Sequence, residues 1–112
     1  MKHIKYFKIN EKDLSYFTPM ARWIASVWDK LDTIPEEKYS DFFEKLENIY
    51  SMDIISIIDG YYNEDRLHYN QNGHAAEFIE NFEDIKITVN GILEKDFGIS
   101  DDTFNQTNKY NL

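Results

Sequence analysis

Apolar residues recur at three- and four-residue steps through much of this chain, and that spacing is typical of amphipathic helices. The clearest case lies in 14–31, where the repeating positions are Leu14, Phe17, Met20, Trp23, Ile24, Val27, Trp28 and Leu31. Thr18-Pro19 lies inside this stripe and fits an N-cap followed by the first helical residue. We therefore predict a helix from Pro19 to about Asp32, preceded by a turn over 12–17.

Two further helices are predicted before the middle of the chain. Pro35 followed by two glutamates favours a helix start, because proline opens helices and acids complement the positive end of the helix dipole. The buried stripe of this helix would comprise Tyr39, Phe42, Phe43, Leu46, Ile49 and Tyr50. The short run 52–58 contains paired isoleucines and is predicted as a helix ended by Gly60, with a buried strand as the alternative.

The second half of the chain is predicted as a loop followed by one long helix. Residues 59–73 contain two glycines and three asparagines, which favour a loop. Apolar residues then follow a helical spacing over 74–97, and Gly98 lies where a helix-ending glycine is expected. Asn90-Gly91 offers a competing interpretation, a β-hairpin over 84–94, because this dipeptide favours a type I′ turn.

These patterns together predict a mainly α fold, a small single-domain bundle of about four helices over residues 1–112. A short N-terminal strand or the C-terminal hairpin would make it α+β. Residues 1–11 are predicted as a basic arm or strand, and 101–112 as a mobile polar tail. The chain has no cysteine, no apolar run of about 20 residues and no secretory signal, so we expect a cytoplasmic protein.

Motifs that carry catalytic chemistry are absent from the sequence. The four glycines are too far apart to build a phosphate-binding loop. His68 and His74 stand six residues apart, which suits neither a metalloprotease helix nor a zinc finger. No serine lies in a nucleophile-elbow context. We therefore expect no enzyme, no cofactor and no metal site.

Charge is the most informative property for function. The chain holds 21 acids and 12 bases, a net charge of −9; residues 1–34 carry six bases and four acids, whereas 35–112 carry six bases and 17 acids. Such a surface repels nucleic-acid phosphates and attracts a basic protein surface. The abundant Ile, Lys and Asn are encoded by AT-rich codons, which suggests a low-GC bacterium, its plasmid or its phage as the source.

The best interface candidates are tyrosines and acids in the second half of the chain. Tyrosine anchors many interfaces because it buries a large ring at low entropic cost, and an acidic strip on the long helix would complement a basic partner. The predicted partner-binding residues are Asp59, Tyr61, Tyr62, Glu64, Asp65, Tyr69, Glu77, Glu80 and Asp84.

Over residues 35–85, the order of short helices, Asp59, the pair Tyr61-Tyr62, an acidic loop and a final helix resembles the arrangement of colicin-type nuclease immunity proteins. This chain is longer than that arrangement, and Gly60 interrupts the segment before the tyrosines. The leading hypothesis is an acidic inhibitor that blocks a basic nucleic-acid-acting protein. It would be either a toxin immunity protein or antitoxin, or a phage anti-defence protein such as an anti-CRISPR acting by DNA mimicry.

The alternative is a structural or assembly subunit that pairs with a copy of itself through its aromatic stripes. Trp23 and Trp28 are five residues apart, so both cannot face one narrow core seam. One of them would then be exposed and available for a homodimer contact.

Overall fold

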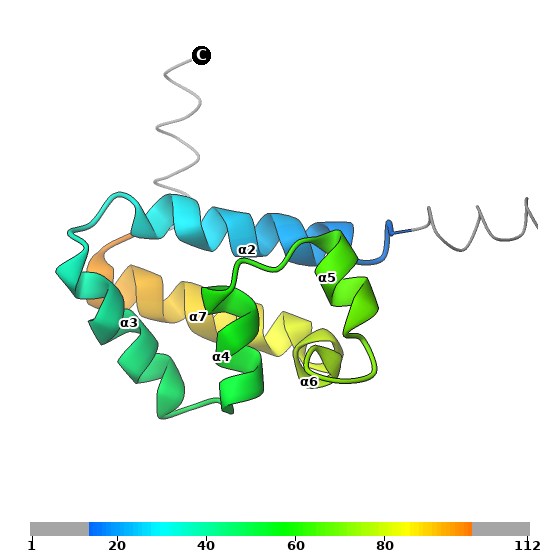
Figure 1. Ribbon diagram of the computed structural model, residues 1–112. Helices are drawn as coiled ribbons and strands as arrows, with labels where there is room; N and C mark the ends of the chain where they lie inside the picture. Colours follow the sequence, from blue (N-terminus) through cyan, green and yellow to red (C-terminus); the bar gives the residue numbers. More distant parts are fainter. Residues whose placement is uncertain (1–13, 100–112) are drawn as a thin grey trace, which may run out of the picture.

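The computed structural model describes residues 14–99, and these form six α-helices and no strand (Figure 1). The longest two, α2 (Thr18–Leu31) and α7 (Phe82–Phe97), run alongside each other in the same direction. The Trp23 indole N–H donates to the Asn90 side chain at 3.2 Å, which ties these two helices together. The prediction of a small, mainly α domain is confirmed.

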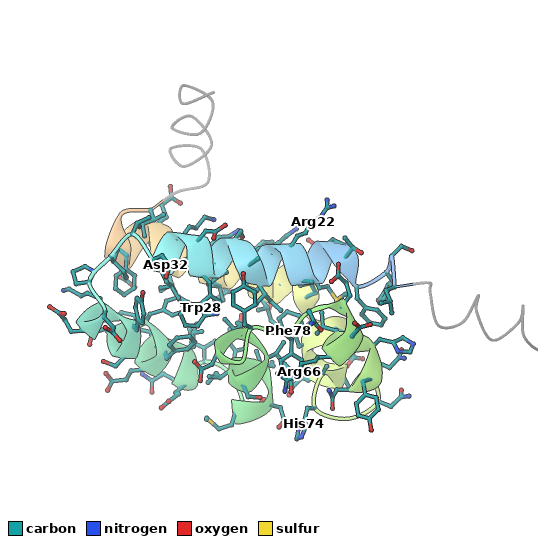
Figure 2. The ribbon with its side chains drawn as sticks, turned by 45° about the horizontal axis from the view of Figure 1, so that its top comes forward. Arg22, Trp28, Asp32, Arg66, His74 and Phe78 are labelled. Atoms are coloured by element: carbon teal, nitrogen blue, oxygen red, sulfur yellow. The ribbon has the colours of Figure 1, made fainter. Side chains whose placement is uncertain are left out.

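Four shorter helices complete the domain. They are α3 (Glu37–Glu47), α4 (Met52–Asp59), α5 (Glu64–Tyr69) and α6 (Ala76–Glu80). Helix α3 lies near the C-terminal end of α2, and α4 lies beside the middle of α2. Helices α5 and α6 lie near the N-terminal end of α2 (Figure 1). Trp28 and Phe78 point into the space between α2 and these helices (Figure 2).

The core is built from the periodic apolar positions. Its fully buried side chains include Ile24 and Leu31 from α2, Phe42 from α3 and Phe78 from α6. The prediction of a helix rather than a strand over 52–58 is confirmed, and Gly60 directly follows α4 as its C-cap. Every isoleucine of α4 is buried, whereas Met52, Asp53, Ser56 and Asp59 are exposed, so this short helix turns one face to the core and the other to the surface.

The predicted loop over 59–73 is wrong in its centre, where α5 forms. The Asn63 side chain caps this helix by accepting the Arg66 backbone N–H at 2.9 Å. Glu64 and Asp65 occupy the first turn, where carboxylates complement the helix dipole. Leu67 is completely buried, so the helix is also held by apolar contact with the core.

The single long helix predicted over 74–97 is divided in two at Asn81. The Asn81 side-chain amide donates to the Glu77 carbonyl at 3.0 Å, and its backbone leaves the helical region before α7 begins. The hairpin alternative over 84–94 is excluded, because α7 covers these residues. Helix α7 ends, as predicted, at Gly98, which adopts a left-handed φ of 72°.

The expected exposed tryptophan is not found. Trp23 is buried, and Trp28 is half-buried and packed against the core. Helix α2 contacts α5 near its start, and near its end Trp28 contacts Phe43 of α3 and donates a hydrogen bond to Ile58 of α4. The expectations for 1–11 and 101–112 lie outside the described residues.

Candidate functional site

The nine predicted partner-binding residues do not form one surface. Asp59 and Tyr61 lie at the end of α4, and Glu64, Asp65 and Tyr69 belong to α5. Glu77 and Glu80 lie on α6, and Asp84 lies in the first turn of α7. Because Asn81 separates α6 from α7, the acids of the two helices do not share one helix face as predicted.

Tyr62 has to be removed from the predicted surface. Its side chain is only 7% exposed and belongs to the core cluster. The Arg66 guanidinium covers its ring at 4.1 Å from the ring centroid. The ring also lies against the backbone of Gly60, where an added Cβ would come within 3.3 Å of it. Tyr62 therefore acts in folding, and a partner does not reach it.

Tyr61, in contrast, lies on the surface within a cluster of aromatic side chains. It is 51% exposed and stacks on Trp28, with ring centroids 6.5 Å apart and planes inclined by 23°. Trp28 also contacts Tyr39 at 5.8 Å and Phe43 at 5.9 Å between centroids. We call Trp28, Tyr39, Phe43 and Tyr61 the aromatic patch; its first three members are half-buried.

Trp28 is the fixed centre of the aromatic patch. Its indole N–H donates to the Ile58 carbonyl at 2.8 Å, near the end of α4. That bond joins α2 to α4, and rotation of the indole would break it. The patch therefore presents its rings in a defined arrangement, which reduces the entropy lost when a partner binds.

Carboxylates border the aromatic patch. The Tyr39 hydroxyl donates to Asp32 at 3.3 Å, and Asp59 lies two residues before Tyr61. Partial burial, the bond to Asp32 and the negative charges of Asp32 and Glu36 raise the pKa of Tyr39 above its usual value. The phenol is protonated at neutral pH, as an ordinary tyrosine is, and it donates its hydrogen bond to Asp32. An aromatic centre with an acidic border suits contact with a basic protein surface.

The backbone of Tyr61 is unusual. Its φ of 55° makes it the only non-glycine residue with positive φ in the described part of the chain. The Tyr62 N–H donates to Ile57 and the Tyr61 N–H to Ile58, which is the Schellman pattern that ends many helices. Glycine normally fills the left-handed position of this pattern, because other residues are strained there by about 1 kcal/mol or more.

The strain at Tyr61 leads to a stability prediction. We expect Tyr61→Gly to unfold with a free energy about 1 kcal/mol greater than that of Tyr61→Ala, because both lose the ring and only glycine relieves the left-handed strain. Urea unfolding followed by circular dichroism measures the difference. Equal unfolding free energies of the two variants would show that the φ of 55° at residue 61 does not destabilise the folded chain.

The α5 residues form a separate, more polar surface. Tyr69 is 88% exposed, and Asp65 and Tyr69 line a hollow of about 720 Å³ together with His68 and His74. No described neighbour stacks on the Tyr69 ring, so this side chain is not held as Tyr61 is. Glu64 is half-buried at the start of the helix.

The acids of α6 and α7 have different surroundings. Glu77 accepts a hydrogen bond from the Ser51 hydroxyl at 2.9 Å, so it joins α6 to the turn before α4. Glu80 and Asp84 line a groove between the start of α2 and the corner where α6 meets α7. This groove brings together two predicted residues from different helices, Glu80 of α6 and Asp84 of α7.

The predicted partner-binding residues do not include three members of the aromatic patch, Trp28, Tyr39 and Phe43. Each fits a helical apolar stripe, and their meeting depends on the packing of α2 against α3, α4 and the Tyr61 turn. The sequence does contain an indication at Trp28, because a residue beside the centre of a helix's apolar stripe is often only half-buried. The residues opposite it could not be identified from spacing alone.

The described residues offer little support for other kinds of site. Among residues 14–99, no group of histidines and acids is placed to hold a metal ion. None of the helices in that range is both long and apolar enough to span a membrane. Comparison of the chain with protein-family models, curated proteins and solved structures finds no match.

Proposed function

We propose that this protein is an acidic inhibitor that binds and blocks a basic nucleic-acid-acting protein. The observation that carries the proposal is the exposed ring of Tyr61, held on Trp28 in a strained backbone conformation and bordered by carboxylates. Strained residues persist where the surrounding structure or the function maintains them, and an exposed ring adds little to folding. A role in binding accounts for a tyrosine at a left-handed position that glycine would occupy without strain.

The charge distribution supports a basic partner. Residues 14–99 hold 17 acids against seven bases, and all but Glu64 of these acids are exposed. Surface carboxylates at this density produce a negative field that accelerates encounter with a positively charged surface and repels nucleic acid. In the proposed mechanism, carboxylates occupy positions that phosphates would take on the partner. The rings of the aromatic patch exclude water and slow dissociation.

Two biological settings fit this mechanism equally. A toxin immunity protein or antitoxin would block the active groove of a nuclease, and a phage anti-defence protein such as an anti-CRISPR would occupy a nucleic-acid channel. The deciding experiment is affinity capture from a lysate of the source organism, with identification of proteins that are released at high salt. The recombinant candidate is then assayed for nucleic-acid binding or cleavage with and without this protein. A retained protein that keeps its full activity would contradict the proposal.

The proposal also predicts that the protein itself does not bind nucleic acid. At about 0.15 M salt we expect no retention of duplex DNA or RNA in a gel-shift assay, because the phosphates meet like charge. Retention at micromolar protein would contradict DNA mimicry. It would also direct attention to the lysines of residues 2–12.

The homo-oligomer alternative proposes pairing through the aromatic stripes and an exposed tryptophan; Trp23 is buried and Trp28 is half-buried. Light scattering on the full chain still tests it directly. A monomer agrees with an inhibitor that presents the aromatic patch to another protein.

A further inference from the structure

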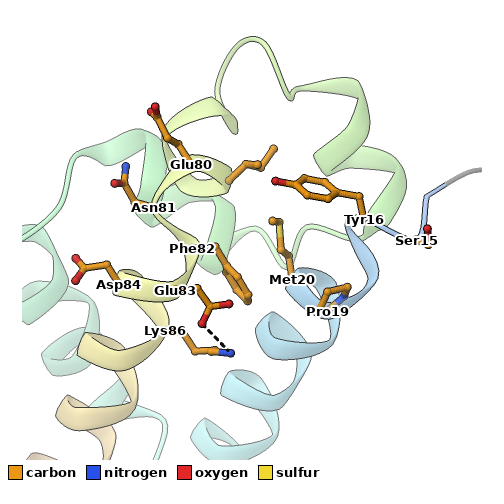
Figure 3. Close-up of a pocket in the computed structure, with 11 residues that line it drawn as sticks. Ser15, Tyr16, Pro19, Met20, Glu80, Asn81, Phe82, Glu83, Asp84 and Lys86 are labelled. Carbon is orange, nitrogen blue, oxygen red and sulfur yellow. Dashed lines mark ion pairs between the residues drawn. The ribbon is translucent and has the colours of Figure 1, made fainter.

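A groove of about 750 Å³, lined by both apolar and polar side chains, lies between the start of α2 and the corner between α6 and α7 (Figure 3). Its walls include the apolar side chains of Tyr16 and Met20 on one side and Ile79 and Phe82 on the other. Tyr16 is 63% exposed and makes an edge contact with Phe17, at 5.1 Å between ring centroids. A large ring is therefore available on the wall of an open groove.

Acidic side chains border the same groove. Glu80, Glu83 and Asp84 all line it, and in Figure 3 the Glu83 carboxylate faces Lys86 beside Phe82 and Met20. Neither Glu80 nor Asp84 makes an ion pair with another residue of the described range 14–99. The groove thus combines an apolar wall with uncompensated negative charge.

Lys86 shows which chemistry the groove accommodates. Its ammonium lies 3.3 Å from a Glu83 carboxylate oxygen and 5.2 Å from the centroid of the Phe82 ring. An ammonium between a carboxylate and an aromatic face gains both ion-pair and cation–π attraction. The chain's own lysine occupies one position that a lysine or arginine of another protein would favour.

We propose that this groove binds a short basic segment of the partner protein. An apolar side chain of that segment packs between Tyr16 and Phe82, while flanking lysines or arginines pair with Glu80 and Asp84 and compete with Lys86 for Glu83. The inference rests on the proposed function for the existence of a basic partner. It adds a second contact surface, at the opposite end of α2 from the aromatic patch.

The test titrates the full-length chain with the peptide Lys-Lys-Leu-Phe-Lys-Lys and follows amide NMR shifts. We expect saturable shifts around Tyr16, Met20 and Phe82, and much smaller ones with peptides in which Glu replaces Lys or Ser-Ser replaces Leu-Phe. Glu80→Gln with Glu83→Gln should weaken peptide binding about fivefold. Lys86→Met should strengthen it about threefold, because it frees Glu83 and keeps the apolar stem; a misfolded variant would not produce such a gain.

Matched controls locate the effect. Glu44→Gln with Glu47→Gln removes the same charge from α3, at the other end of the molecule, and should leave peptide binding unchanged. Tyr16→Ser should weaken binding, whereas Met52→Ser, at an equally exposed apolar side chain of 63%, should not. The inference is overturned if the Ser-Ser peptide binds as tightly, or if the α3 control weakens binding as much as the groove variant.

Two other occupants of the groove would also overturn the inference. If the Glu80/Glu83 variant shifts amides of residues 2–12 without any peptide, the chain's own basic segment fills the groove. If light scattering shows a dimer that this variant dissociates, a second copy does. The inference and the proposed function can fail separately. If the groove variant still retains the captured basic protein fully, the groove inference fails and the proposed function stands. If the peptide binds the groove but no nucleic-acid-acting protein is captured, the proposed function fails and the binding of a basic segment stands.

Discussion

Replacing Tyr62 with alanine is expected to destabilise the domain by about 3 kcal/mol, while the same change at Tyr61 should cost less than about 1 kcal/mol. Tyr62 is 7% exposed and fills space between Gly60 and the Arg66 guanidinium, so its removal leaves a cavity and an uncovered cation. Tyr61 loses only a half-exposed stacking contact. Urea unfolding, followed by tryptophan fluorescence and circular dichroism, measures both values.

Tyr62→Phe is the control for this comparison. It keeps the ring and the contact with Arg66, so its unfolding free energy should stay within about 1 kcal/mol of the original. If Tyr61→Ala proved the more destabilising change, the aromatic patch would be part of the core and the argument for an exposed anchor would fail. If the slope of unfolding free energy against urea concentration is the same for all variants, the differences in stability can be assigned to the folded state.

The two tyrosines illustrate what the sequence alone can and cannot establish. They are adjacent, identical and both follow Gly60, so composition and spacing treat them alike. What separates them is the left-handed turn at Tyr61, which directs one ring inward and leaves the other on the surface. That turn depends on the hydrogen bonds to Ile57 and Ile58 at the end of α4, and spacing does not reveal which residue of the turn takes the positive φ.

Helices whose apolar stripe is local were predictable, and the breaks between them were not. The stripe of α2 repeats over four turns, so its existence followed from spacing. Asn81 fits a helix interior and a helix boundary about equally, and its side-chain bond to Glu77 decides between them only in the folded chain. Helix α5 did have a local signal: Asn63 followed by two acids is a helix start that the high polarity of 59–73 obscured.

Partner binding should depend strongly on Tyr61. We expect Tyr61→Ala to weaken the complex with the captured partner by at least about 2 kcal/mol, roughly 30-fold, with nearly all of the change in the dissociation rate. The ring is presented on a fixed indole, so little entropy is lost when it is buried. Surface plasmon resonance on the full chain separates the two rates. Tyr69→Ala, which removes a more exposed ring from α5, is the matched control and should change neither rate.

Charge variants at the border of the aromatic patch should behave differently from the tyrosine variant. Glu36→Gln with Asp59→Asn is expected to lower the association rate several-fold and to flatten its dependence on salt, because border charges steer encounter more than they hold the complex. Glu64→Gln with Asp65→Asn removes the same charge from α5 and should have a smaller effect on the rate. If the Glu64/Asp65 and Tyr69 variants changed the binding rates instead, the partner would contact the polar hollow lined by Asp65 and His68. The strained Tyr61 turn, which costs about 1 kcal/mol, would then be explained within the fold by the hydrogen bonds that end α4 and by the contact of the ring with Trp28.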